Sequence, residues 1–206
     1  VSTRPLDDTT TETKDFDIWY VERKTENDNW SEAINLGSPI NTEHGEFYPS
    51  IANNGNFYFT RDNVELKRKD DIYVSEYNDG IHTEPKVLPD TINSVGYEYN
   101  AYISPDESYL IYGCYNRKDG YGSGDLYISH NTENGWSQSE NLGDNINTPK
   151  MDYCPFVINN TLYFTSKRDN TKTDFKTSIS IEELLEEFNK YDNGLSRLYQ
   201  VSIKDL

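Results

Sequence analysis

The chain has little of what metal centres, disulfide frameworks and membrane spans require. It contains two cysteines, one methionine and three histidines among 206 residues. Cys114 and Cys154 lie far apart with no histidine near either one, which does not match the spacing of a zinc site. No run of about 18 apolar residues occurs, so no transmembrane helix is expected. We therefore expect no metal, no cofactor and no membrane insertion. The two cysteines are expected to be buried free thiols, with a disulfide between them as the alternative.

Basic residues are also scarce. The chain has 19 Lys and Arg against 36 Asp and Glu, and its formal net charge is -17. A surface this acidic repels phosphate backbones and anionic membranes, so nucleic acid is not an expected partner. We expect the charge mainly to maintain solubility, with attraction of cations or of a basic partner as the alternative.

Aromatic residues are plentiful, although only 34% of the residues are hydrophobic. They make up 14% of the chain and include 17 tyrosines. Disordered chains lack aromatic and β-branched residues, whereas here both recur in short runs typical of strands. The run from Glu98 onward predicts strands over 99–103 and 109–115, with turn residues between them, a third strand over 125–129 and an outer strand over 136–142.

Similar runs precede and follow this one. The copies share four features. Each has a leucine in its outer strand (Leu36, Leu88, Leu142) and an Ile-Asn pair in the connector (Ile40 and Asn41, Ile92 and Asn93, Ile146 and Asn147). An acidic residue opens the first strand (Glu46, Glu98, Asp152), and an aspartate opens the third (Asp17, Asp71, Asp125). A period of about 50 residues with four strands in each copy is typical of a β-propeller. We therefore predict an all-β protein of four-stranded antiparallel blades, with about four blade equivalents in a single domain over 1–206.

One segment departs from the repeat. Residues 169–196 form an insertion in the fourth copy, and within it 180–191 reads as a helix of about three turns. Ser180 and Glu183 match a capping box. One helical face is apolar, and Gly194 is placed as the C-cap. We expect this helix to pack on the face or rim of the propeller, where it covers a site or docks a partner.

The copies resemble the WD-like propeller repeat of the TolB family. The characteristic run is Ile103-Ser-Pro-Asp106, a hydrophobic strand, and then Asp125-Leu-Tyr-Ile128. The resemblance covers nearly the whole chain outside the insertion, and it is closest to a bacterial envelope group through DFDIWYVER, WSEAINLG and SGDLYIS. It implies a periplasmic or other envelope location. It also implies further blades upstream, as in a six-bladed ring. The first and last copies are incomplete, and the alternative is that the two ends combine to close a smaller ring.

Two sets of residues are candidates for ligand binding. Glu46, Glu98 and Asp152 would form an acidic ring if they faced the central channel, and Arg61, Arg117 and Arg168 could pair with them. The alternative is a repeated structural ion pair, because a feature present in every copy usually serves the copy itself. Tyr97 and Tyr121 could form a stacking platform for a sugar or peptide, with packing in the core or rim as the alternative.

The function predicted from these features is a non-catalytic binding or scaffold propeller that takes a protein or glycan ligand on one face. A glycan-active hydrolase of sialidase-like type is the alternative, and two close carboxylates at the channel mouth would favour it. A third possibility is a metal-stabilised structural module. The Asp-boxes of a sialidase are absent from the sequence, and the three histidines occupy non-equivalent loop positions without a nucleophile motif.

Overall fold

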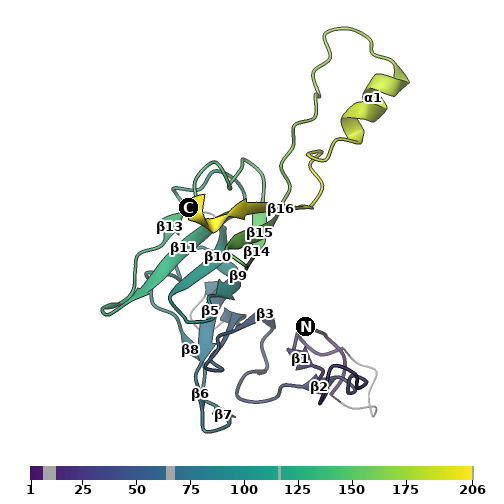
Figure 1. Ribbon diagram of the computed structural model, residues 1–206. Coiled ribbons are helices and arrows are strands. Elements are labelled where there is room, and N and C mark those ends of the chain that lie inside the picture. Colours follow the sequence, from purple (N-terminus) through teal and green to yellow (C-terminus); the bar gives the residue numbers. More distant parts are fainter. Residues whose placement is uncertain (7–12, 64–67, 116, 206) are drawn as a thin grey trace.

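The computed structural model describes residues 1–206 except 7–12, 64–67, 116 and 206. The described part is built from antiparallel sheets, with one α-helix, α1 (Ile181–Phe188), and a short 3-10 turn over Ile203–Asp205. Figure 1 shows the sheets following one another along the chain, with α1 set apart from them. The prediction of an all-β chain with one inserted helix is confirmed.

The sheets form four successive units. Unit 1 (residues 2–35) contains β1 (Trp19–Tyr20) and β2 (Ile34–Asn35), extended by a bridge between Ser2 and Asp17. Unit 2 (46–87) has the strand order β3 (Glu46–Ile51), β4 (Phe57–Asn63), β5 (Arg68–Ser75), β8 (Lys86–Val87), and a hairpin of β6 (Tyr77–Asn78) and β7 (Ile81–His82) follows β5.

Units 3 and 4 repeat this order. Unit 3 (97–141) contains β9 (Tyr97–Ile103), β10 (Tyr109–Tyr115), β11 (Asp125–Thr132), β12 (Gly135–Trp136) and β13 (Glu140–Asn141), with both β12 and β13 on β11. Unit 4 (152–202) contains β14 (Asp152–Ile158), β15 (Thr161–Ser166) and β16 (Arg197–Ser202). The first strands β3, β9 and β14 lie next to one another in that order.

The predicted inner strands agree closely with these bounds, but two details differ. The outer strands pair over only two residues each, at β2, β8 and β13, because these polar segments are largely exposed and follow the sheet edge only briefly. The charged segment over 62–70, between the second and third strands of unit 2, has a composition that favours a loop. Its ends instead extend β4 and β5, and residues 64–67 of that prediction lie outside the described residues.

The hydrophobic core lies between consecutive units. Units 1 and 2 share a cluster that includes Ile18, Ile40 and Phe59. Units 2 and 3 share a larger cluster around Ile72 and Tyr112, and units 3 and 4 enclose the third cluster. Apolar side chains alternate along the inner strands, so each sheet has one face for the preceding unit and one for the following unit.

The connectors explain why the Ile-Asn pair repeats. The amide group of Asn41 donates to the carbonyl of Ile18 and accepts from its N–H, both at 2.9 Å. The side chain thus makes the two hydrogen bonds that a neighbouring strand would make. Asn93 makes the same two hydrogen bonds with the backbone of Ile72, and Asn147 makes them with the backbone of Leu126. These buried amides fix each connector to the third strand of the unit before it.

The length of the helix and its C-terminal end differ from their predictions. Ser180 and Glu183 do form the capping box, but α1 ends at its C-cap Asn189 after about two turns. Gly194 is not the C-cap. Its φ is +79°, and its N–H donates to the carbonyl of Arg168 at 3.1 Å, at the base of the insertion.

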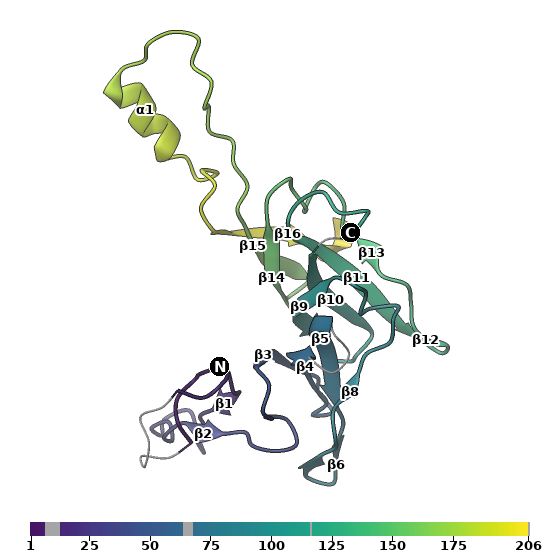
Figure 2. The same ribbon diagram turned by 180° about the vertical axis from the view of Figure 1, so that it is seen from behind.

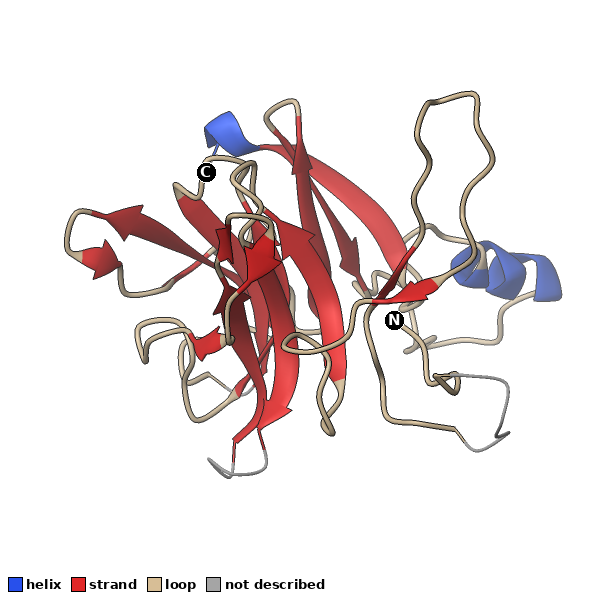
Figure 3. Cartoon of the chain, turned by 90° about the horizontal axis from the view of Figure 1, so that it is seen from below, coloured by secondary structure: helices blue, strands red, loops and turns tan. Residues whose placement is uncertain are grey.

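The expected packing of α1 on the sheets is wrong. No residue of α1 is buried, and Figures 1 and 2 show the helix standing away from the strands at the end of two extended segments. Figure 3 places it at one side of the strand body. The apolar residues Ile181, Leu185 and Phe188 are 72%, 51% and 60% exposed. The two extended segments hold the apolar face out of reach of the sheets.

Candidate functional site

The repeated acids and arginines form closed ion pairs. Glu46 lies 3.1 Å from Arg61 and Glu98 lies 3.3 Å from Arg117. Asp152 lies 3.7 Å from Arg168. The expected pairing is thus observed. The side chains of the three acids are 0% exposed, so none of them lines an open surface.

Each pair has the same surroundings. A hydroxyl four residues before the acid donates to it, from Thr42, Ser94 and Thr148. Each guanidinium also lies over an aromatic pair of its own sheet: Phe59 and Tyr73, Tyr112 and Tyr127, Phe164 and Tyr199. This geometry is that of a repeated structural ion pair. Ligand contact by these six side chains remains a prediction.

Burial dominates the electrostatics of Glu46. The pKa of the Glu46 carboxyl is raised by burial, although the hydrogen bonds from Thr42 and the Arg61 guanidinium oppose the shift. Asp15, Asp17 and Glu46 also place one oxygen each within 4.8 Å of one another. The Lys14 ammonium lies against this group, 2.5 Å from Asp15 and 2.9 Å from Asp17. The chain thus supplies its own cation there.

The first strands carry a second repeated feature, which the sequence analysis missed. Two residues after each acid, the backbone has a positive φ: +50° at Tyr48, +55° at Asn100 and +51° at Cys154. The strand pairing shifts register at the same places, so each first strand contains a β-bulge. Non-glycine residues held in this conformation each cost roughly 1–3 kcal/mol and concentrate at functional sites.

The three bulges border two adjoining hollows, because their strands lie side by side. The larger has a volume of about 690 Å³ and is lined by all three bulge residues, together with Pro49 and Pro155. The smaller has a volume of about 320 Å³ and contains Tyr48 and Asn100. Five tyrosines line the smaller hollow: Tyr48, Tyr97, Tyr99, Tyr115 and Tyr153. We call these two spaces together the first-strand hollow.

Two buried polar atoms in this hollow have no hydrogen-bond partner among the described residues. They are Nδ2 of Asn100, whose residue is 5% exposed, and the hydroxyl of Tyr99. A buried donor without a partner costs about 1–3 kcal/mol. Both residues belong to the lining of the smaller hollow.

The two predicted tyrosines have different positions. Tyr97 lines the smaller hollow, 6.0 Å from Tyr115 between ring centres. Tyr121 lies in a loop, is 49% exposed, and lines neither part of the first-strand hollow. Among the residues that line this hollow there is one carboxylate, Asp70, whereas glycoside hydrolysis requires a pair.

The cysteines are reduced, but only one is buried. Cys114 is 1% exposed and donates from Sγ to Glu98 at 3.0 Å. Cys154 is exposed, which corrects the expectation of two buried thiols. It occupies the third bulge, and the bulge places it at the larger hollow instead of in the core.

A signal for the bulges was present in the sequence. The first strands read EFYPSI, EYNAYI and DYCPFVI, and two of them carry a proline directly after the bulge residue. Proline inside a strand points to an edge or a bulge. The residue directly before this proline, which differs between the units, is the bulge residue.

Comparison with protein-family models and with curated protein sequences finds no match to this chain. No helix in the described part of the chain is long and apolar enough to cross a membrane.

Proposed function

We propose that this chain is a non-catalytic binding module whose sheets are blades of a β-propeller and whose ligand sits in the first-strand hollow. The repeated strand order and the adjacent first strands support the propeller arrangement. The ligand would be a glycan or a peptide. On the resemblance of its repeats alone, we place the module at the bacterial cell envelope.

One observation carries this proposal. Tyr48, Asn100 and Cys154 share the same unusual backbone conformation at equivalent positions, yet their side chains differ. The acids, arginines and connector asparagines keep their chemistry from unit to unit, as structural groups do. A backbone conformation that repeats in three units and presents a different side chain to the hollow in each of them suits a concave recognition site with a few specific groups.

The chemistry of the hollow agrees with such a ligand. Tyrosines present flat apolar surfaces with polar tips, which suit sugar rings and extended peptides. Nδ2 of Asn100 offers a buried donor to a ligand oxygen. With one carboxylate among the lining residues, the site favours binding over hydrolysis.

A thermal-shift screen against glycans, envelope peptides and divalent ions tests the proposal, because a ligand that binds the folded state raises its apparent stability. The informative variant is Tyr48→Asn, which removes the ring and keeps a residue that tolerates positive φ. Tyr121→Ala is the matched control, since both tyrosines are nearly half exposed. We expect the shift to be lost in Tyr48→Asn and kept in Tyr121→Ala. The opposite pattern, or no shift with any glycan or peptide, would refute this site.

A further inference from the structure

The insertion of unit 4 carries α1 on a base that is closed by hydrogen bonds. The insertion leaves the sheet after β15 and returns at β16, so it is internal to the unit. At its base the N–H of Asn170 donates to the carbonyl of Asp192 at 2.9 Å, and a bridge joins Asp169 to Asn193. The side-chain amide of Asn170 also donates to the Asp192 carboxylate at 3.0 Å. The two extended segments are thus joined where they leave the sheet.

The helix is stabilised by bonds within the insertion. In the capping box the N–H of Glu183 donates to the Ser180 hydroxyl at 3.1 Å, and the Glu183 carboxylate accepts from the Ser180 N–H at 2.8 Å. Near the other end the Glu187 carboxylate accepts from the Lys190 ammonium at 2.5 Å and from the N–H of Lys172 at 2.7 Å. A helix ordered in this way loses less conformational entropy on binding than a disordered segment does.

Two neighbouring rows of side chains on α1 have opposite chemistry. Ile181, Leu185 and Phe188 are spaced four and three residues apart, so they lie on one face of the helix. Each of them is more than half exposed. We call these three residues the apolar stripe. Glu182 and Glu186 follow Ile181 and Leu185 in the sequence and lie beside the stripe, and both are exposed.

Glu186 is a carboxylate that the helix itself does not use. It lies in the last turn, where a negative charge opposes the helix dipole, and that turn contains no basic residue. It is also four residues from Glu182, and like charges at this spacing destabilise a helix. Glu187 has the Lys190 ammonium as its counter-ion, whereas Glu186 has no ion-pair partner among the described side chains. The charge of Glu186 is therefore available to a partner.

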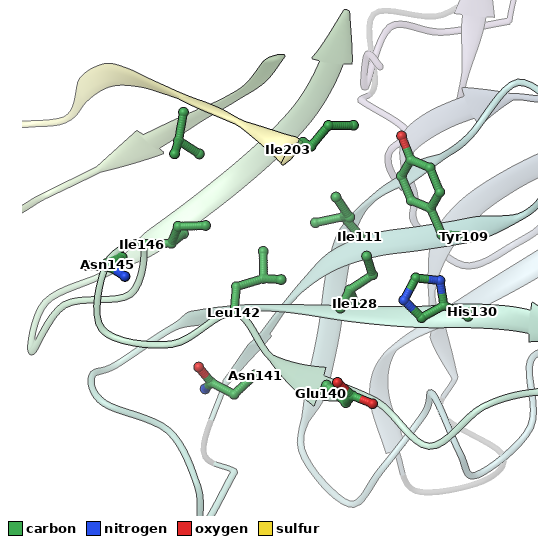
Figure 4. A pocket seen from close by; sticks show the side chains of 11 residues that line it. Tyr109, Ile111, Ile128, His130, Glu140, Asn141, Leu142, Asn145, Ile146 and Ile203 are labelled. Atoms are coloured by element: carbon green, nitrogen blue, oxygen red, sulfur yellow. The ribbon is translucent and has the colours of Figure 1, made fainter. Parts of the chain in front are cut away.

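The apolar cavity of the sheets does not receive the stripe. This cavity lies between units 3 and 4 and has a volume of about 670 Å³. Figure 4 shows Ile111, Ile128, Leu142 and Ile203 around it, and none of the described residues of the insertion lines it. A second copy of the chain is also an unsuitable occupant. Two chains that each have a formal net charge of -17 repel one another, and pairing two stripes would bring glutamates together.

We propose that the apolar stripe of α1 is a docking surface for a partner protein whose own binding surface is apolar and bordered by Lys or Arg. The stripe supplies anchors at positions i, i+4 and i+7, as in recognition of a helix by a groove. Glu182 and Glu186 face the basic border, which sets the orientation of the partner and speeds its approach. No residue of α1 lines the first-strand hollow, so this surface is separate from the proposed ligand site.

Two designed helical peptides are the probes. Both carry leucines at i, i+3, i+4 and i+7, and the positions bordering this face are lysine in one peptide and glutamate in the other. Fluorescence anisotropy of the labelled peptides would measure their binding to the full chain. The informative protein variant is Leu185→Gln, which interrupts the stripe and keeps the net charge and a good helix former. Leu195→Gln is the matched control, because Leu195 is a similarly exposed leucine of the same insertion outside the helix.

We expect the lysine peptide to bind the wild type and Leu195→Gln saturably, and the glutamate peptide not to bind. Leu185→Gln should bind the lysine peptide about 10-fold more weakly, because burial of a leucine is lost. Glu186→Gln should weaken binding about 3-fold, because one exposed ion pair is lost. Thermal unfolding would establish that the three variants remain folded.

Four outcomes would overturn the proposal. The lysine peptide could fail to bind, or the glutamate peptide could bind equally well. Equal binding of the lysine peptide to Leu185→Gln and to the wild type would show only a general attraction to an acidic chain. Sedimentation velocity that finds a dimer of the wild type and a monomer of Leu185→Gln would make a second copy the occupant of the stripe.

Discussion

The side chain of Asn93 hydrogen-bonds both backbone groups of Ile72. Its Nδ2 donates to the carbonyl of Ile72 at 2.9 Å, and the N–H of Ile72 donates to its Oδ1 at the same distance. Nδ2 also reaches the carbonyl of Leu88 at 2.9 Å. Ile72 and Asn93 are both 0% exposed. A single side chain thus joins the third strand, the outer segment and the connector.

Asn93→Ala should lower the free energy of unfolding by about 2–4 kcal/mol, because it leaves buried backbone groups without partners. Urea unfolding followed by circular dichroism measures this change. Asn134→Ala is the control, since Asn134 is exposed, and it should change stability by less than about 0.5 kcal/mol. Equal effects of the two substitutions would show that the connector amides do not contribute to the free energy of unfolding.

The buried ion pairs should be costly to break from one side. Arg61→Met leaves the carboxylate of Glu46 buried without its cation and should destabilise the protein by about 3–5 kcal/mol. Adding Glu46→Gln should recover part of that loss, because the uncompensated charge is then gone. Lys86→Met, which breaks an exposed pair with Glu76, should cost less than about 1 kcal/mol.

The loss of stability caused by Arg61→Met should depend on pH. Burial raises the pKa of Glu46, so the folded protein takes up a proton on this carboxyl at a higher pH than the unfolded chain does. Its contribution to stability is therefore present at low pH and lost as the pH rises through the folded pKa. The deficit of Arg61→Met relative to the wild type should shrink as the pH is lowered from 7 toward 5. A constant deficit would contradict this assignment.

His82 should make the stability of the protein change with pH in the opposite direction. Burial lowers the pKa of His82, which packs against the rings of Phe57 and Tyr77. The neutral ring is favoured in the fold, so its stabilisation is present above about pH 6.5 and is lost as the pH falls through the folded pKa. His82→Phe should remove this acid-side loss in thermal melts between pH 7 and 5. His130→Asn, at an exposed position, should retain it.

The two thiols should differ in reactivity. Cys154 is exposed at the larger hollow, whereas Cys114 is buried and bonded to Glu98. A thiol reagent should modify one cysteine in the native protein and the second only after unfolding. Desolvation of the Cys154 thiol by the surrounding wall of the hollow raises its pKa, so its rate of modification should keep increasing with pH above the ordinary thiol range. In Cys154→Ser the fast phase should vanish. A fast phase that persists would place Cys114 at the surface.

Removing the helix should leave the sheets intact. No residue of α1 is buried, so replacing residues 173–186 with a Gly-Ser linker should change the free energy of unfolding by less than about 1 kcal/mol. Urea unfolding would test this value. A larger loss would mean that the helix contributes to packing. Loss of ligand binding at unchanged stability would instead assign the insertion a direct role in recognition.

Much of the local structure followed from the sequence. Strand β10 and the capping box at Ser180 agree with their predicted positions because each depends on residues close together in the chain. The repeated Ile-Asn pairs and acids predicted equivalent units. Their pairing with arginines also followed, since each acid opens the first strand of its unit and each arginine lies at or just beyond the end of the second strand.

The position of the helix and of the hollow did not follow in this way. The apolar face of α1 predicted a packing partner, but the extended segments on both sides of it determine where the helix lies. The bulges bring Tyr48, Asn100 and Cys154 together although more than 50 residues separate each from the next.

The sequence by itself determined the class of fold, the repeated units and the residues that join them, because period, turn chemistry and strand propensity act over short distances. Only the tertiary structure decided which side chains face the first-strand hollow and that the repeated acids are fully buried. These features arise where neighbouring units meet, and the spacing of residues along one strand does not specify how two sheets pack.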